Sequence, residues 1–166
     1  MKKIIIVLAA VASTSFIFAG ISNPAVFSLQ GKFQKNPYYK IIPASELPAN
    51  IQETINQYLG GMSKVTRATI DDYKYEVETQ DGYRAKFKLN GSIIKVESNN
   101  QAIPLSILSK LPGNIHTYVK SKYADWKLLE VKIKSSKIEL ELEKDHLEGE
   151  LEFNGSGILI KEDIDS

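Results

Sequence analysis

Apolar and polar residues alternate along two stretches of the chain, residues 73–89 and 131–153. Successive side chains of a β-strand point to opposite faces of a sheet, so this alternation is typical of strands that are buried on one face only. Asp81-Gly82 interrupts the first stretch, and Asn90-Gly91 and Asn154-Gly155 end the two stretches. Each Asn-Gly pair predicts a type I′ hairpin, whose two central residues need positive φ. The predicted strands cover residues 73–77, 83–89, 93–96, 131–133, 138–142, 147–153 and 158–160.

A segment with apolar residues at every third or fourth position precedes each alternating stretch, and this spacing predicts two amphipathic helices. We expect the first helix to begin at an N-cap, Ser45, and to end at Gly60-Gly61, and the second helix to begin at Ser109. Each helix should bury its apolar face against the apolar face of the sheet. The residues with this spacing are Leu47, Ile51, Ile55 and Leu59 in the first helix, and Leu111, Ile115, Val119 and Tyr123 in the second.

The chain matches itself when it is shifted by 64 positions, which indicates an internal repeat. The register slips by one between the first helix and Asp81, so we expect one strand connection to differ in length between the copies. The predicted fold class is therefore α+β, with two tandem helix-plus-antiparallel-sheet repeats and helices packed on one face of the sheet. The matched segments are Ser45 with Ser109, Leu47-Pro48 with Leu111-Pro112, Asn50-Ile51 with Asn114-Ile115, Asp81 with Asp145, and Asn90-Gly91-Ser92 with Asn154-Gly155-Ser156.

The beginning of the chain predicts export. Residues 1–20 combine two early lysines, an apolar stretch and a small-residue end, which is the build of a signal peptide. No later segment is apolar enough to span a membrane, so we expect a periplasmic or secreted protein with no membrane span after cleavage. The predicted organisation is a signal peptide at 1–20, a leader segment at 21–42, a first repeat at 43–98, a linker at 99–104 and a second repeat at 105–163.

The amino-acid composition excludes several classes of function. The chain has no cysteine, so it has neither disulfides nor thiolate chemistry. Its net charge of +1 gives no basic face for nucleic acid. The two histidines, His116 and His146, stand far apart without a metal-ligand partner four residues away, and no catalytic or nucleotide-binding motif is present. We therefore expect no enzyme activity, no metal site and no cofactor.

Charged residues on the polar side of the alternation are the candidate binding surface. Two strands of the second repeat carry glutamates that face one another, and like charges in that arrangement destabilise a sheet. The alternatives are a binding site for a basic partner, a site for a hard cation such as calcium, and a solvated face relieved by neighbouring lysines. The equivalent strand of the first repeat is basic. The candidate residues are Glu139, Glu141, Glu148, Glu150 and Glu152 in the second repeat, and Arg84, Lys86 and Lys88 in the first.

Both repeats resemble the PepSY-like, β-lactamase-inhibitor-like family of exported bacterial proteins. The first repeat carries the resemblance in Leu47-Pro48-Ala49-Asn50-Ile51, Tyr75-Glu76-Val77-Glu78, Asp81-Gly82-Tyr83 and Asn90-Gly91. The second repeat keeps Leu111-Pro112 and Phe153-Asn154-Gly155 but has Ile138-Glu139-Leu140 in place of Tyr-Glu-Val. The resemblance implies an α+β repeat with a sheet backed by helices, and it carries over no catalytic residue.

Two functional hypotheses remain at this point. The first is an exported, non-catalytic binding or inhibitor-like module that uses the open face of its sheet to bind another exported or envelope protein. The second is a structural envelope protein whose only interaction is self-association through the edges of its sheet.

Overall fold

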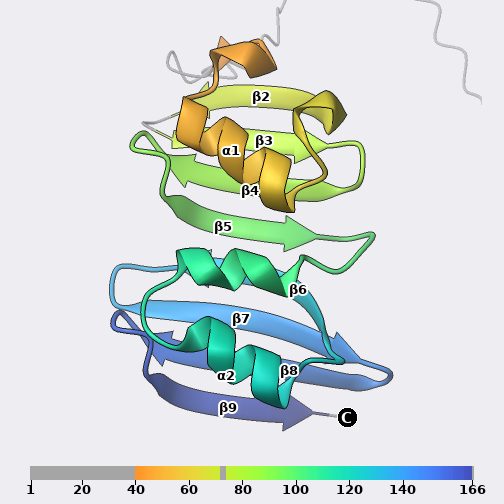
Figure 1. Ribbon diagram of the computed structural model, residues 1–166, viewed down its shortest axis with the longest axis vertical. Helices are drawn as coiled ribbons and strands as arrows, with labels where there is room; N and C mark the ends of the chain where they lie inside the picture. The colour runs from red at the N-terminus through yellow and green to blue at the C-terminus, as the bar shows by residue number, and fades with distance from the viewer. Residues whose placement is uncertain (1–39, 72–73, 166) are drawn as a thin grey trace, which may run out of the picture. The chain divides into compact units, whose positions relative to one another are not determined.

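The computed structural model describes residues 40–71 and 74–165 as an α+β fold built on one antiparallel sheet of nine strands (Figure 1). The strands follow one another in the sheet in the order in which they occur along the chain. The strands are β1 (Lys40–Ile41), β2 (Val65–Asp71), β3 (Lys74–Thr79), β4 (Tyr83–Lys88), β5 (Ile93–Ser98), β6 (Lys127–Ile133), β7 (Lys137–Lys144), β8 (Leu147–Asn154) and β9 (Leu159–Asp165). The helices are α1 (Ala49–Tyr58) and α2 (Ile115–Lys122), with 3-10 segments η1 (Ala44–Glu46), η2 (Met62–Lys64) and η3 (Leu105–Lys110).

Each α-helix is followed by four consecutive strands, β2–β5 after α1 and β6–β9 after α2. The two groups of strands are joined edge to edge, because β5 pairs with β6 through Lys95–Lys132, Val96–Val131 and Glu97–Glu130. This pairing makes one sheet from strands that belong to different halves of the chain (Figure 1). The connection between β3 and β4 is one residue longer than that between β7 and β8, as the slip in register predicts.

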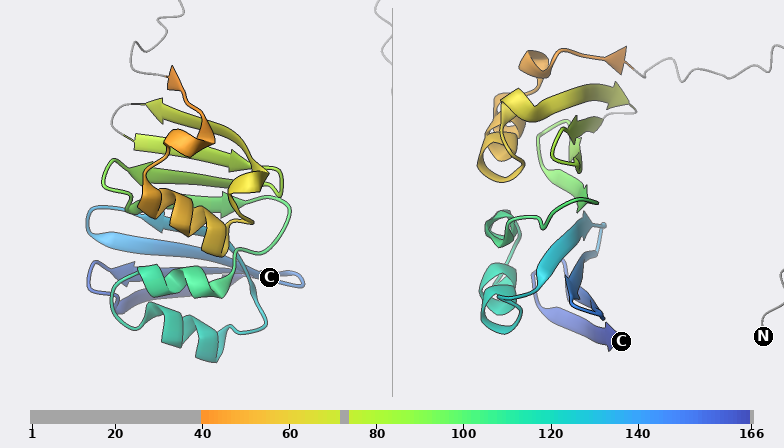
Figure 2. Two further views of the ribbon diagram at one scale, coloured as in Figure 1. Left: turned by 45° about the horizontal axis from the view of Figure 1, so that its top comes forward. Right: turned by 90° about the vertical axis from the view of Figure 1, so that its right-hand side faces the viewer.

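The helices all lie on one face of the sheet, and the core fills the space between the two layers (Figure 2). The predicted alternation is confirmed, since the apolar side chains of the strands are buried under the helices. Phe87 and Phe153 are among the largest fully buried side chains, and they hold equivalent places in β4 and β8. The opposite face of the sheet has no helix over it in the described part of the chain (Figure 2). The charged side chains that alternate with the buried residues of the strands lie on this face.

The starts of both α-helices differ from the prediction. Ser45 and Ser109 are not N-caps, because they lie inside the 3-10 segments η1 and η3. α1 starts after Pro48, and α2 starts after Asn114. The residue before a proline is disfavoured in helical backbone, and Leu47 and Leu111 are accordingly extended, with ψ of 143° and 155°. The Leu-Pro step therefore separates a short turn from the helix in each half.

The predicted type I′ hairpins are also wrong. Asn90, Asn154 and Gly155 do not have positive φ, whereas Gly91 and Gly157 have φ of 82° and 81°. Both hairpins use three-residue loops, which end in a residue of left-handed conformation. Accordingly, the amide of Gly91 donates to Lys88 O at 2.8 Å, and the amide of Gly157 donates to Asn154 O at 2.9 Å. Gly91 and Gly157 therefore hold the same place in their turns. The sequence repeat had matched Gly91 with Gly155, which lies two positions before Gly157.

The sequence pattern did not predict β2, and it predicted only the first residues of β9. A bulge between Val65 and Arg67 breaks the alternation in β2, and most residues of β9 are charged. The predicted signal peptide and most of the leader segment lie outside the described residues, as do Tyr38, Tyr39 and Tyr73. Among the described helices, none has the length and apolar character needed to cross a bilayer.

Candidate functional site

The open face of β6–β9 carries carboxylates that stand directly opposite one another in neighbouring strands. Glu130 pairs with Glu141, Glu141 with Glu150, and Glu150 with Asp163, so one row of acids crosses all four strands. A shorter row runs beside it, in which Glu143 pairs with Glu148 and Glu148 with Asp165. We call these residues the acidic surface, and its members are Glu130, Glu141, Glu143, Glu148, Glu150, Asp163 and Asp165.

The acidic surface surrounds a hollow of about 360 Å³. Its lining combines most of the carboxylates with the partly exposed side chain of Leu129. Leu129 reaches this face because the register shifts between Leu128 and Glu130, which places an additional residue in β6 at the bulge. The hollow therefore offers an apolar contact within a ring of negative charge.

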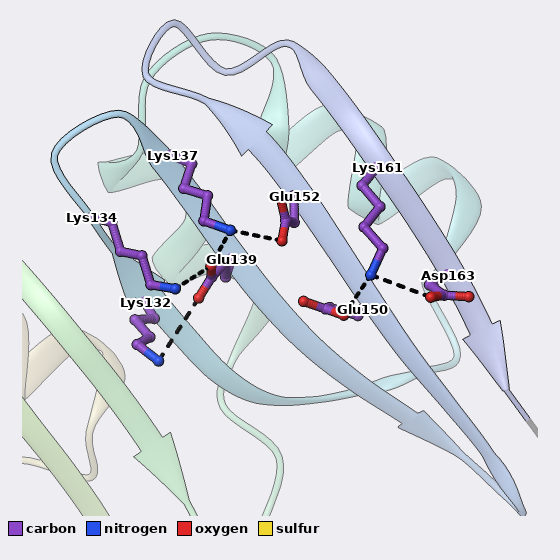
Figure 3. Close-up of polar contacts among 8 residues, drawn as sticks. All are labelled: Lys132, Lys134, Lys137, Glu139, Glu150, Glu152, Lys161 and Asp163. Atoms are coloured by element: carbon purple, nitrogen blue, oxygen red, sulfur yellow. Dashed lines mark hydrogen bonds and ion pairs between the residues drawn. The ribbon is translucent and has the colours of Figure 1, made fainter.

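The remaining two glutamates of the predicted site, Glu139 and Glu152, are neutralised by lysines (Figure 3). Lys137 lies between them, with its Nζ 2.7 Å from Glu139 and 2.8 Å from Glu152. Lys134 also pairs with Glu139, and Lys132 lies 3.8 Å from it. Hydrogen bonds from Lys134 and Lys137 lower the pKa of Glu139 to about 2. For this pair the arrangement is the solvated face relieved by neighbouring lysines, because the β6–β7 hairpin brings three lysines back over the glutamates.

A further lysine compensates part of the acidic surface from the edge of the sheet. Lys161 of β9 lies 2.9 Å from Glu150 and 3.3 Å from Asp163 (Figure 3). Lys95 of β5 pairs with Glu130 at 2.8 Å, and Lys127 pairs with Glu143 at 3.3 Å. These three lysines pair with four of the seven carboxylates, Glu130, Glu143, Glu150 and Asp163, and leave the other three without an ion pair among the described residues.

Glu141 and Glu148 have no ion-pair partner among the described residues. Loss of water from around its carboxylate raises the pKa of Glu141, and the charges of Glu130 and Glu150 raise it further, while the charges of Lys95 and Lys132 act in the opposite direction. A neighbouring cation would reverse this effect, since it favours the ionised carboxylate. Positive charge added near Glu141 would therefore be favourable.

The basic candidates lie on the same open face but in the other half of the sheet. Arg84 lies 3.5 Å from both Glu78 and Glu97, and Lys86 lies 3.3 Å from Glu76. Lys88 stands opposite Lys74 at the end of β4. Acids of β3 thus pair with bases of β4 across the hairpin, and Arg84, Lys86 and Lys88 do not join the acidic surface.

Sequence analysis did not identify Glu130, Asp163 and Asp165 of the acidic surface, nor Leu129 in its hollow. Glu130 could have been found from the sequence, because it continues the polar positions of its strand as Glu143 does. Asp163 and Asp165 lie in the part of β9 that was not predicted. Leu129 reaches the open face only because of the bulge in β6.

The described residues contain no group of three or more acidic, histidine or cysteine side chains arranged to hold a metal ion. The carboxylates follow the spacing of strands in a sheet and do not converge on one point. His116 is in the first turn of α2, and His146 is in the β7–β8 turn, so neither contributes to the acidic surface.

Replacing Lys137 with glutamine should leave Glu139 and Glu152 opposed without their shared cation. In the native protein the pKa of Glu139 is about 2 and its ordinary value is 4.5, so its stabilisation is present above pH 4.5 and is lost between pH 4.5 and 2. Lys137→Gln should lower the urea midpoint at pH 7. It should also lose less stability between pH 4.5 and 2 than the native protein does. Lys127→Gln, which removes a lysine outside this group, is the control. Equal pH profiles for the native protein and Lys137→Gln would contradict the bridging role.

Comparison with known proteins gives one family and several structures. The chain matches the sequence model of a family described as "putative beta-lactamase-inhibitor-like, PepSY-like" twice, over residues 20–95 and 73–161. A search of curated proteins found no match.

Three solved structures cover most of the chain. A "putative calcium-regulated periplasmic protein" from Bacteroides thetaiotaomicron is 28% identical, with a TM-score of 0.61 over 77% of this chain and 97% of its own. A periplasmic protein of the DUF2874 family from Bacteroides vulgatus is 26% identical, with a TM-score of 0.61 and the same coverage. A second periplasmic protein from Bacteroides vulgatus, of unknown function, is 23% identical and has the same fold, with a TM-score of 0.58 over 75% of this chain and 98% of its own.

Proposed function

Because the chain belongs to the PepSY-like family of exported proteins, we propose that it is a non-enzymatic module that binds a basic segment of another exported or envelope protein through the acidic surface. The predicted periplasmic or secreted location is confirmed by the family and by the periplasmic relatives. The family description refers to inhibitors of β-lactamases, but nothing in the acidic surface selects a β-lactamase over other basic partners.

The observation that carries the proposal is the row of opposed carboxylates across β6–β9. Like charges that face one another in a sheet cost free energy, and a cation between them removes that cost. Glu139 and Glu152 have such a cation within the chain, in Lys137. Glu141 and Glu148 have none among the described residues, so a lysine or arginine from a partner would supply what Lys137 supplies to the neighbouring pair.

The hollow suits a long basic side chain better than a small ion. Lysine and arginine bury an aliphatic stem while the charged head stays near polar groups. Leu129 would contact the stem, and the surrounding carboxylates would receive the head. Charge of one sign on an open surface also accelerates the encounter with an oppositely charged partner.

We also propose that the two halves of the sheet arose as tandem copies. Residues 43–98 would form the first repeat, 99–104 the linker and 105–163 the second repeat, after a signal peptide at 1–20 and a leader at 21–42. The repeated order of one α-helix and four strands supports this division, and so do the two matches to the family model. In this proposal the second copy has become the acidic binding surface, while the first keeps balanced charges.

The test uses a variant that removes Glu141 and Glu148, two of the three carboxylates of the acidic surface that have no ion-pair partner among the described residues. Glu141→Gln/Glu148→Gln should weaken binding of a fluorescent oligolysine peptide by about fivefold or more, because the peptide loses two of its acidic contacts. Added salt should weaken binding to the native protein more than binding to the variant. Fluorescence anisotropy at several salt concentrations measures both effects.

Glu46→Gln/Glu53→Gln is the matched control, because it removes the same charge from η1 and α1 on the other side of the sheet. The proposal is wrong if both double variants bind the peptide as the native protein does. Calcium provides a further comparison, since the Bacteroides thetaiotaomicron relative is described as calcium-regulated. If millimolar calcium displaces the peptide at an ionic strength where sodium chloride does not, the hollow is a cation site and not a peptide site.

A further inference from the structure

The last strand of the sheet has an open edge, and its sequence is complementary to itself. We propose that β9 pairs antiparallel with β9 of a second copy of this chain, in the register that places residue 162 opposite its own counterpart. This inference does not rest on the proposed function, because it concerns the edge of the sheet and not its open face.

β9 carries charged side chains at four of its seven positions and a bulge at Ile160, but its charges are of both signs and can pair with those of a second copy. It is seven residues long and ends the strand order, so no described strand pairs with its outer side. It contains no proline, and its only lysine, Lys161, is pulled back toward Glu150. Ile160 and Ile164 are 57% and 39% exposed, and Ile158 just before the strand is 63% exposed. An unpaired edge of this length with exposed isoleucines is a template for a further strand.

The register centred on residue 162 matches apolar and charged residues at the four positions around the centre, and it places Leu159 opposite Asp165 at the ends of the strand. Residues at equal distances from the centre face each other in an antiparallel pair, so Ile160 meets Ile164 of the second copy and Lys161 meets Asp163. Each pair occurs twice because the arrangement has two-fold symmetry. Directly opposed side chains are close enough for apolar and opposite-charge pairs to stabilise the seam. Shifting the register by one residue would instead place Ile160 opposite Asp163.

Glu162 is the residue that would oppose its own copy, and its charge is already neutralised. Lys122 of α2 donates to Glu162 at 2.6 Å and 2.8 Å, and the hydroxyl of Tyr118 donates to it at 2.6 Å. These contacts draw the carboxylate toward the helix layer and away from the outer edge. The central pair therefore brings together two ion pairs and not two bare carboxylates.

The other end of the sheet does not offer an equivalent edge. β1 has only two residues, Lys40 and Ile41, so in the described part of the chain it presents too short a template. Association should therefore stop at a dimer, with one edge used by each copy. An interface of one short strand per copy is small, so we expect dissociation in the range of about 1–100 µM.

Sedimentation velocity of the exported chain over this concentration range tests the proposal. Ile160→Lys should raise the dissociation constant about tenfold or more, whereas Ile41→Lys at the opposite edge should leave it unchanged. Lys161→Asp and Asp163→Lys should each weaken the dimer, because each places like charges opposite one another. The double variant carrying both substitutions restores alternating charges and should recover the dimer. Circular dichroism melts establish that each variant is folded.

A chain that stays monomeric throughout the range would overturn the proposal. So would a dimer that is weakened by Ile41→Lys but not by Ile160→Lys, since another edge would then form the interface. The proposed register would be wrong if both single variants are folded and form a weaker dimer but the double variant does not recover the native dimer. Oligolysine binding by Ile160→Lys separates this result from the proposed function, because the variant keeps every carboxylate of the acidic surface.

Discussion

Gly157→Ala should destabilise the protein by about 3 kcal/mol, through backbone strain and a clash that the fold cannot relieve. Gly157 has φ of 81°, a region in which residues with a side chain are strained. A Cβ at this position would also lie 2.2 Å from the carbonyl oxygen of Pro112, which belongs to the backbone just before α2. The loss should appear as a lower urea midpoint with an unchanged slope.

Gly155→Ala is the matched control in the same loop. The nearest atom to a Cβ there is the carbonyl oxygen of Ser136, at an ordinary distance of 3.8 Å, and the φ of Gly155 is not positive. Alanine at a compatible position restricts the unfolded chain, so we expect equal stability or a gain of about 0.5 kcal/mol. Gly91→Ala should fall between the two, because its φ is positive but its close neighbour is the movable end of Asn50. Equal effects at Gly155 and Gly157 would contradict the assignment of the turn.

Leu140→Ala should cost about 3 kcal/mol, since it leaves a cavity in the core. Leu140 is fully buried in β7 between Val131 and Leu151 of the adjacent strands. The next residue, Glu141, faces the other side of the sheet and stands opposite Glu130 and Glu150. Glu141→Gln removes a like charge from this row, so we expect stability equal to or slightly above that of the native protein. Urea unfolding of both variants at pH 7 measures the difference.

The contrast between these neighbours tests the basis of the proposed function. If Glu141→Gln destabilises the protein as strongly as Leu140→Ala does, Glu141 is a structural group and cannot be reserved for a partner. If Leu140→Ala has little effect, the helix layer does not cover β7 in the way that its burial indicates.

The two halves of the sheet differ in how charged residues face one another across neighbouring strands. In the first half, Glu76 and Glu78 face Lys86 and Arg84, so opposite charges meet across the strands. In the second half, the corresponding strands carry glutamate on both sides, as in the Glu141–Glu150 pair. The stability lost to repulsion is small on an exposed face, so such a surface can be maintained for binding.

Several features could be predicted from sequence because they depend on local pattern. The alternation in β3, β4, β7 and β8 placed their apolar residues in the core and their charged residues on the open face. The spacing of apolar residues located both α-helices, and Gly60-Gly61 correctly marked the end of α1, with φ of 84° and 96°. Predictions failed where the backbone departs from a regular strand or helix. The bulge in β2 interrupts the alternation of apolar and polar residues, and the proline steps before the helices place the helix starts later than predicted.

The sequence by itself determined which side chains share a face of each strand, because the period of a strand is set by its own backbone. It also determined the absence of thiol chemistry, since the chain has no cysteine. Only the tertiary structure decided which strands are neighbours and in what register, because those depend on contacts between distant segments. The β5–β6 pairing, the row from Glu130 to Asp163, the Lys137 bridge and the contact of Gly157 with Pro112 all arise at this level. Alternation identified the glutamates of β7 and β8 as polar, and register alone made them part of one acidic surface.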